Sequence, residues 1–202
     1  PADVARRIVA DSGIDLHRPL LLQVSRFDPW KDPLGVIEAY QTVKRARPEV
    51  QLALVGALAG DDPEGWGILE QANAASLTDP DVYVFTNLTG VGNVEVNAFQ
   101  RLADVVIQKS LKEGFGLVAS EALWKGSPLV AGRAGGIPMQ IPEGYQQFLV
   151  DGIPACADRA LALLDDPEQR AAYGRAGREH VRAHFLLPRL VRDHLALVKS
   201  LL

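Results

Sequence analysis

The stretch ADVVIQKSLKEGFGLVASEALWKGSPLVAG, residues 103–132, contains two short apolar runs on either side of a glycine-containing loop and a helical pattern. The runs 103–110 and 127–132 are nearly continuous in hydrophobicity, which is typical of strands buried on both faces of a parallel sheet. Residues 117–125 between them have helical character. Strand, loop, helix and strand in this order predict a right-handed βαβ unit, from which parallel sheets are built.

The same alternation extends over most of the chain. Three further apolar runs and three helical patterns alternate at residues 19–25, 33–47, 50–58, 65–76, 81–88 and 93–102. This order predicts an α/β fold, a doubly wound parallel sheet with helices on both faces. A helical C-terminal tail from about 154 to 202 follows, with Asp166 as the expected cap of one helix and Pro167 at its first position. We expect this tail to pack on the sheet or to reach a neighbouring domain.

Composition narrows the function classes. A chain of 202 residues with 48% hydrophobic and 23% charged residues is ordinary for one globular domain. A net charge of −4 without a basic cluster argues against nucleic-acid and membrane partners. The single cysteine, Cys156, excludes an internal disulfide, and no apolar run is long enough to span a membrane, so we expect a cytoplasmic protein. The chain begins at Pro1 rather than Met, which indicates a fragment or an excised domain.

In doubly wound sheets the ligand binds beyond the carboxyl ends of the strands, so the loops after the strands are the candidate sites. The first, SRFDPWKDP at residues 25–33, carries Arg26 and Lys31 between two prolines. An arginine fork and a lysine point charge suit a diphosphate bound without a metal. The alternative is that both cations are solvated loop residues and that Asp32 caps the next helix. The spacing alone slightly favours this alternative.

The second loop contains Gly114 and Gly116 immediately before a helix. Two glycines let the backbone approach a ligand closely, and the free amides at a helix start attract phosphate oxygens. Glu113 precedes the helix, where a sugar attached to the phosphate would lie, and Glu121 lies one turn inside, where it could accept hydrogen bonds from a ribose. A helix that begins with acidic residues explains Glu113 equally well but explains Glu121 less well.

Other motifs give weaker signals. The pair Gly135-Gly136 follows a strand and indicates either a tight turn or another close backbone approach. Asp61-Asp62 reads as a helix start with Pro63 at the first helical position rather than as a metal site. The four histidines form no plausible ligand set, and Cys156 reads as a small buried residue. Neither a dinucleotide-binding glycine fingerprint nor a phosphate-binding Walker loop is present in the sequence.

The segment from Glu113 to Glu121, E-G-F-G-L-x-x-x-E, resembles the E-x7-E motif of retaining glycosyltransferases with the two-domain GT-B architecture, the sucrose-synthase-like group known as family 4. The resemblance covers essentially the whole chain, including VSRFDPWKDP and EALWKGSPLVAGRAGGIP. Within the group, QVSRFDPWKD, DDPEGW and NAFQR look most like the glycosyltransferring trehalose synthases, which join a nucleotide-activated glucose to free glucose.

The resemblance implies that residues 1–202 form the nucleotide-sugar donor-binding domain, the C-terminal Rossmann-like half, with the N-terminal acceptor domain absent from this chain. Arg26 and Lys31 would contact the donor diphosphate, Glu121 the ribose and Glu113 the donor sugar. The amides of Gly114, Phe115, Gly116 and Leu117 would line the sugar–phosphate junction, and the loop at Asn87 and Leu88 would hold the base. We expect no cofactor and no metal.

The sequence departs from the family pattern in two places. Gln146-Gln147-Phe148 stands where family members usually have T-G-F, and Lys109 stands where proline or methionine is common. Neither position belongs to the expected donor contacts, but a lysine near the phosphate loop would be expected to alter donor preference.

The expected partners are a nucleoside diphosphate glucose, either ADP-glucose or UDP-glucose, and an acceptor, glucose, bound together with the missing domain. A homodimer remains open. Two other functions also remain open: a sucrose- or glycogen-type transferase of the same family, and a nucleotide-binding module without catalysis. In every case we expect the isolated domain to be inactive in transfer.

Overall fold

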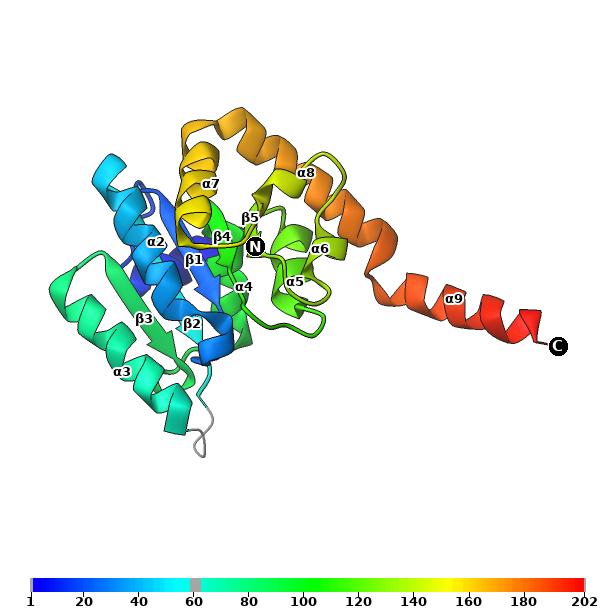
Figure 1. Cartoon of the computed structure of the whole chain (residues 1–202), viewed down its shortest axis with the longest axis horizontal. Coiled ribbons are helices and arrows are strands. Elements are labelled where there is room, and N and C mark those ends of the chain that lie inside the picture. The colour runs from blue at the N-terminus through cyan, green and yellow to red at the C-terminus, as the bar shows by residue number, and fades with distance from the viewer. Residues whose placement is uncertain (1, 59–62, 202) are drawn as a thin grey trace.

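Six short strands form one parallel sheet in the computed structural model, which describes residues 2–58 and 63–201 (Figure 1). The strands are β1 (Leu20–Val24), β2 (Gln51–Gly56), β3 (Val82–Thr86), β4 (Val105–Gln108), β5 (Leu129–Gly132) and β6 (Leu149–Val150). Their order across the sheet is β3-β2-β1-β4-β5-β6, so the predicted doubly wound α/β fold is confirmed. The sequence did not predict β6, because its two residues are too few to produce a recognisable pattern.

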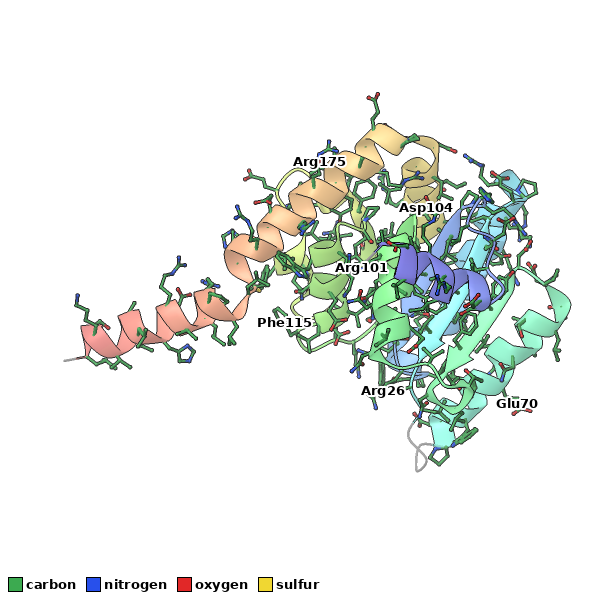
Figure 2. The ribbon with its side chains drawn as sticks, turned by 180° about the vertical axis from the view of Figure 1, so that it is seen from behind. Arg26, Glu70, Arg101, Asp104, Phe115 and Arg175 are labelled. Atoms are coloured by element: carbon green, nitrogen blue, oxygen red, sulfur yellow. The ribbon has the colours of Figure 1, made fainter. Side chains whose placement is uncertain are left out.

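Helices cover both faces of this sheet. On the face in front in Figure 1 lie α2 (Pro33–Ala46), α3 (Pro63–Thr78) and α7 (Ile153–Asp165). On the other face, nearer the viewer in Figure 2, lie α1 (Ala2–Asp11), α4 (Asn93–Leu102) and α5 (Leu117–Lys125). The strands are buried between these two layers, which is why every residue of β1, β4 and β5 is buried and why their sequences are almost entirely apolar.

The helix α8 (Pro167–His184) continues from α7 and packs against α5. Asp166 caps α8 by accepting a 2.8 Å hydrogen bond from the amide of Gln169, as the sequence predicts. Tyr173 of α8 is fully buried, and its hydroxyl donates a 3.0 Å hydrogen bond to the carbonyl of Leu129 in β5. The ring of Phe148 stacks on Tyr173 with 5.0 Å between centroids. The aromatic residue of the altered Gln-Gln-Phe segment is therefore part of the core.

The last helix, α9 (Leu187–Ser200), extends away from the body of the molecule (Figure 1). None of its described residues is buried. One side of the helix carries exposed apolar side chains at Leu187, Leu190, Val191, Leu195 and Val198. The predicted tail thus divides into α7 and α8, which pack on the body, and α9, which does not. Among the residues that the structure describes, no helix is both long and apolar enough to cross a membrane.

Candidate functional site

The strand order reverses between β1 and β4, and the loops that follow these two strands lead to opposite faces of the sheet. A crevice therefore opens between the two loops at the carboxyl end of the sheet. Arg26 and Phe115, one from each loop, lie at this end of the molecule in Figure 2. A pocket of about 350 Å³ occupies the crevice. Six residues selected from the sequence line it: Arg26, Lys31, Glu113, Phe115, Gly116 and Leu117.

An ion pair joins the two loops inside this pocket. Lys31 Nζ lies 2.7 Å from Glu113 Oε2, and the two side chains are only 18% and 11% exposed. The hydroxyl of Ser110 donates a longer, 3.4 Å hydrogen bond to the same carboxylate oxygen. Ser110 in turn accepts a 3.1 Å hydrogen bond from Gln108 Nε2. A cation and an anion selected from separate motifs thus neutralise each other in the pocket.

Arg26 has a different environment. Its guanidinium lies 2.9 Å from the carboxylate of Asp28, and its side chain is 60% exposed. Asp28 is nearly buried and caps the short helix η1 (Pro29–Lys31) by accepting a 2.8 Å hydrogen bond from the amide of Trp30. The carboxylate of Asp28 therefore fixes the backbone at Trp30 and holds one side of the Arg26 guanidinium, while the rest of the guanidinium stays accessible to a ligand.

Direct contacts connect the two loops outside the pocket as well. The carbonyl of Trp30 accepts a 2.8 Å hydrogen bond from the amide of Leu111. Lys112 Nζ lies 3.7 Å from the centroid of the Trp30 indole, within the range of a cation–π interaction. The buried ammonium of Lys109 pairs with the carboxylate of Asp32. These contacts make the two loops one structural unit. Arg26 and Lys31 on one loop are therefore held at a fixed position relative to Glu113 on the other.

The start of α5 completes the pocket. Gly116 has a left-handed backbone with φ of 84°, and a Cβ there would lie 2.8 Å from Cγ1 of Ile137. Only glycine fits this position without strain. Within the part of the chain that the structure describes, no side chain caps α5 at Gly116. A nine-residue helix whose first amides are left without a side-chain cap at a pocket is suited to bind an anion.

The pair Gly135-Gly136 shapes the loop of Glu113 from outside. Gly135 has φ of 51°, and a Cβ on it would lie 2.0 Å from the carbonyl oxygen of Glu113. The amide of Gly136 donates a 2.7 Å hydrogen bond to the carbonyl of Gly114. The close backbone approach expected for this pair is therefore made to the neighbouring loop, which the two glycines support.

Buried glutamines fix the same backbone, and the sequence reasoning missed them. Gln140 is fully buried, and its Nε2 donates to the carbonyl of Phe115 while its Oε1 accepts a 2.5 Å hydrogen bond from Ser120 Oγ. Gln23 in β1 donates a 2.8 Å hydrogen bond from Nε2 to the carbonyl of Lys31. The signal in the sequence was the presence of a lone glutamine inside an apolar run, where burial requires a hydrogen-bond partner.

Besides Gly114, whose carbonyl accepts the hydrogen bond from Gly136, three of the selected residues lie outside the lining of this pocket. Glu121 is on α5 and accepts a 3.3 Å hydrogen bond from Nε2 of Gln100 in α4. Asn87 lies just after β3, where its Oδ1 accepts a 2.9 Å hydrogen bond from the amide of Leu58. Leu88 beside it is 62% exposed. Their expected contacts with the ribose and the base remain predictions.

Among the described residues, the remaining sequence candidates form no further site. Asp61 and Asp62 lie outside the described residues. The rings of His180 and His184 are 4.8 Å apart, but no group of three or more potential metal-binding His, Cys, Asp or Glu side chains occurs among the described residues. Burial raises the pKa of Cys156 to about 12, which fits the interpretation of this cysteine as a buried core residue.

The sequence model of the family described as "Glycosyl transferases, group 1" matches residues 4–180. The chain belongs to this family. Among curated proteins, this group 1 glycosyl transferase is 60% identical over 200 residues to the trehalose synthase of Rubrobacter xylanophilus. That alignment covers 99% of the present chain and 48% of the relative, so the chain spans about half the length of the curated relatives it matches. The family resemblance seen in the E-x7-E segment is confirmed.

Solved structures of similar fold include chains about twice as long as this one. The group 1 glycosyl transferase chain superposes on the sucrose-phosphate synthase of Thermosynechococcus elongatus with a TM-score of 0.76 and 27% identity, covering 97% of this chain and 48% of that one. It superposes on Anabaena HepE, solved in complex with UDP and glucose, with a TM-score of 0.77 and 22% identity, covering 98% and 52% of the two chains. Because the identity to HepE is only 22%, that likeness concerns the fold alone.

Proposed function

We propose that this chain is the donor-binding domain of a retaining glucosyltransferase, which transfers glucose from ADP-glucose or UDP-glucose to glucose and so forms trehalose. The observation that carries the proposal is the pocket at the strand-order reversal, in which Arg26, Lys31 and the start of α5 face Glu113. The identity to a trehalose synthase supports the choice of glucose as donor sugar and acceptor.

In this proposal the diphosphate binds between Arg26, Lys31 and the first amides of α5. An arginine fork, an ammonium and a helix start together offer donors and positive charge to several phosphate oxygens. Glu113 then accepts hydrogen bonds from hydroxyls of the glucose. When the phosphates bind the ammonium of Lys31, the ion pair with Glu113 breaks, and the Glu113 carboxylate is free to turn toward the sugar.

The nucleoside end of the donor extends from this pocket. Glu121 binds the ribose hydroxyls from one turn inside α5, where its carboxylate is held by Gln100. The backbone at Asn87 and Leu88, after β3, binds the base. Asn87 is anchored to the loop after β2 by its hydrogen bond with Leu58, which gives this backbone a fixed shape.

The residues of the pocket suit the departure of the diphosphate. As the anomeric carbon–oxygen bond breaks, negative charge grows on the leaving phosphate, and Arg26, Lys31 and the α5 amides stabilise it. The acceptor hydroxyl attacks from the face that the diphosphate leaves and gives its proton to the departing phosphate oxygen, so the configuration at the anomeric carbon is retained. Glu113 positions the glucose during this exchange. The proposal uses protein cations and amides for charge stabilisation and requires no metal ion.

The acceptor site belongs to a second domain in this proposal. The chain spans 48% of the Rubrobacter trehalose synthase, which leaves room for a domain of similar size. The exposed apolar side of α9 supports the idea, because a stripe of this kind is normally buried against another surface. Residues 1–202 would therefore be the donor half of the active enzyme.

Isothermal titration calorimetry with ADP-glucose, UDP-glucose and GDP-glucose tests donor binding. We expect the chain to bind at least one of the three, and Lys31→Met to weaken that binding by about tenfold or more, because a charged phosphate contact is lost. Lys199→Met on the exposed helix α9 is the matched control and should bind like the unchanged chain. Absence of binding to all three sugar nucleotides would refute the proposal.

A further inference from the structure

Lys109 forms a second ion pair between the two site loops. It directly follows β4, and its side chain is only 6% exposed. Its ammonium pairs with the carboxylate of Asp32, the residue after Lys31 in the other loop. Among the described residues that line the 350 Å³ pocket, Lys109 does not occur. Lys109 therefore does not line the pocket beside Lys31, and its ion pair with Asp32 links it to that residue.

Asp32 has an unusual backbone. Its φ and ψ of 52° and 50° are left-handed, and it is the one non-glycine residue with positive φ within residues 2–58 and 63–201. Its amide ends η1 by donating to the carbonyl of Pro29, and its Oδ1 starts α2 by accepting a 3.1 Å hydrogen bond from Gly35. Such a conformation persists in a residue with a side chain only where neighbouring contacts hold it. Gly35 and Lys109 supply these contacts.

The turn at Asp32 determines where Lys31 points. The carbonyl of Lys31 is held by Gln23, and the next residue is held by Lys109, so the backbone is fixed on both sides of the side chain. From this position Lys31 Nζ reaches Glu113 across the pocket. If Asp32 lost its buried partner, its carboxylate would turn toward water, and the left-handed turn would relax.

We propose that Lys109 is a positioning residue that directs Lys31 at the diphosphate by holding the left-handed turn of Asp32. This inference rests on the proposed function, because it takes a nucleoside diphosphate as the ligand that Lys31 meets. In this proposal Lys109 raises the affinity for phosphate without touching it. Because Lys109 acts only through Asp32, changing both residues should weaken phosphate binding no more than changing one.

Three variants of the full chain separate positioning from general stability. Lys109→Met removes the charge and still fills the buried space. Asp32→Asn breaks the same ion pair from the other side, while asparagine still caps a helix and tolerates a left-handed backbone. Lys44→Met is the matched control, because Lys44 also pairs with carboxylates, those of Asp79 and Asp81, but lies near the amino ends of the strands, away from the pocket at their carboxyl ends.

Two measurements apply to each variant, both made well below its thermal unfolding midpoint. Calorimetry compares ADP, UDP and GDP with the corresponding nucleosides, and hydrogen exchange follows the amides of Lys31 and Asp32 without ligand. We expect Lys109→Met and Asp32→Asn each to weaken diphosphate binding by about tenfold, with nucleoside binding unchanged and faster exchange at both amides. The double variant should be no weaker than either single one. Lys44→Met should lower the midpoint only.

The proposal is overturned if both ion-pair variants bind the diphosphate as the unchanged chain does, or if the amides of Lys31 and Asp32 exchange at the original rate. Equal weakening of nucleoside and diphosphate would also contradict it, because that would mean a general loss of structure. Failure of the unchanged chain to bind any nucleoside diphosphate would instead refute the proposed function. The exchange rates of the ligand-free chain would then still decide whether Lys109 holds the turn.

Discussion

At the scale of single residues, the 2.7 Å ion pair between Lys31 and Glu113 means that a bound diphosphate would compete with Glu113 for the ammonium of Lys31. Without ligand, the carboxylate neutralises the ammonium. With a diphosphate bound, the same carboxylate would lie near two further negative groups unless it turned toward a neutral sugar. In the proposed function, Glu113 would therefore disfavour the phosphates and favour the glucose, which would make the pocket selective for the complete donor over the free nucleotide.

Glu113→Gln should separate these two effects. The amide retains hydrogen-bonding groups but removes the negative charge, so we expect the nucleoside diphosphate to bind about two- to fivefold more tightly. The affinity gained by adding glucose to that nucleotide should fall, because the amide is a weaker acceptor for sugar hydroxyls. Calorimetry with the free nucleoside diphosphate and its glucose ester gives both numbers. Unchanged discrimination between the two ligands would contradict the role assigned to Glu113.

The sequence located the residues of the pocket better than it located their supports. Arg26, Lys31 and Glu113 could be selected because a charged residue after a buried strand interrupts an apolar pattern on a loop. Gln23 and Gln140 escaped notice because the sequence does not show which polar side chains within or beside apolar runs are buried. Only the three-dimensional structure shows which backbone carbonyl each buried amide holds.

At the scale of elements, a charge cluster at the amino ends of the strands ties α2 to the turn before β3. Lys44 Nζ lies 2.6 Å from Asp79 and 2.8 Å from Asp81, and Arg18 lies 2.6 Å from Asp81. The hydroxyl of Tyr40 donates a 3.0 Å hydrogen bond to Asp79. The hydrogen bond from Arg18, opposed by burial and aided by Lys44, lowers the pKa of Asp81 from its ordinary value of 3.8.

This shift predicts how stability depends on pH. Because the pKa of Asp81 is lower in the folded state, its carboxylate contributes stability above the unfolded pKa of about 3.9, and the contribution is lost as the pH falls through the folded value. We expect Asp81→Asn to lower the free energy of unfolding at pH 7 and to lose less of it between pH 5 and pH 3. Urea unfolding at each pH measures both quantities.

Asp193→Asn, on the exposed helix α9, is the control for this experiment and should follow the unchanged chain at every pH. If Asp81→Asn lost as much stability on acidification as the unchanged chain, the cluster would not be a source of the pH dependence.

Most long elements could be predicted and the shortest ones could not; the exception among the long ones is the ten-residue helix α1, which the sequence analysis did not predict. The helices at Asn93–Leu102 and Leu117–Lys125 have the predicted boundaries, because each follows a recognisable break and continues for several turns. The four-residue helix α6 (Ile137–Gln140) and the two-residue strand β6 were missed. Elements of this length are stabilised by tertiary packing and carry too few residues to establish a hydrophobic period.

At the scale of the whole molecule, residues 2–58 and 63–201 contain the proposed donor pocket, one doubly wound sheet and a last helix, α9, with no buried residue. We expect the purified chain to bind the donor and to form no trehalose, because in the proposed function the acceptor is held by a second domain. Fusing the part of the Rubrobacter trehalose synthase that this chain does not match should restore transfer, and Lys31→Met in the fusion should abolish it. Chromatographic detection of trehalose measures the activity.

Trehalose formation by the isolated chain, at a rate that follows its concentration and disappears with Lys31→Met, would show that one sheet suffices. A fusion that binds donor but remains inactive would indicate that the missing half must come from a closer relative.

The sheet order also bears on how the chain folds. The strands β1, β2 and β3 are consecutive neighbours, and so are β4, β5 and β6, so each half can form from local segments. The seam between the halves pairs only two residues of β1 with β4, against five between β1 and β2. Closing it requires segments far apart in the chain, which is slow. We infer that the pairing of β1 with β4 forms last. A donor that contacts both Arg26 and Glu113 would bind to both halves and so stabilise this pairing.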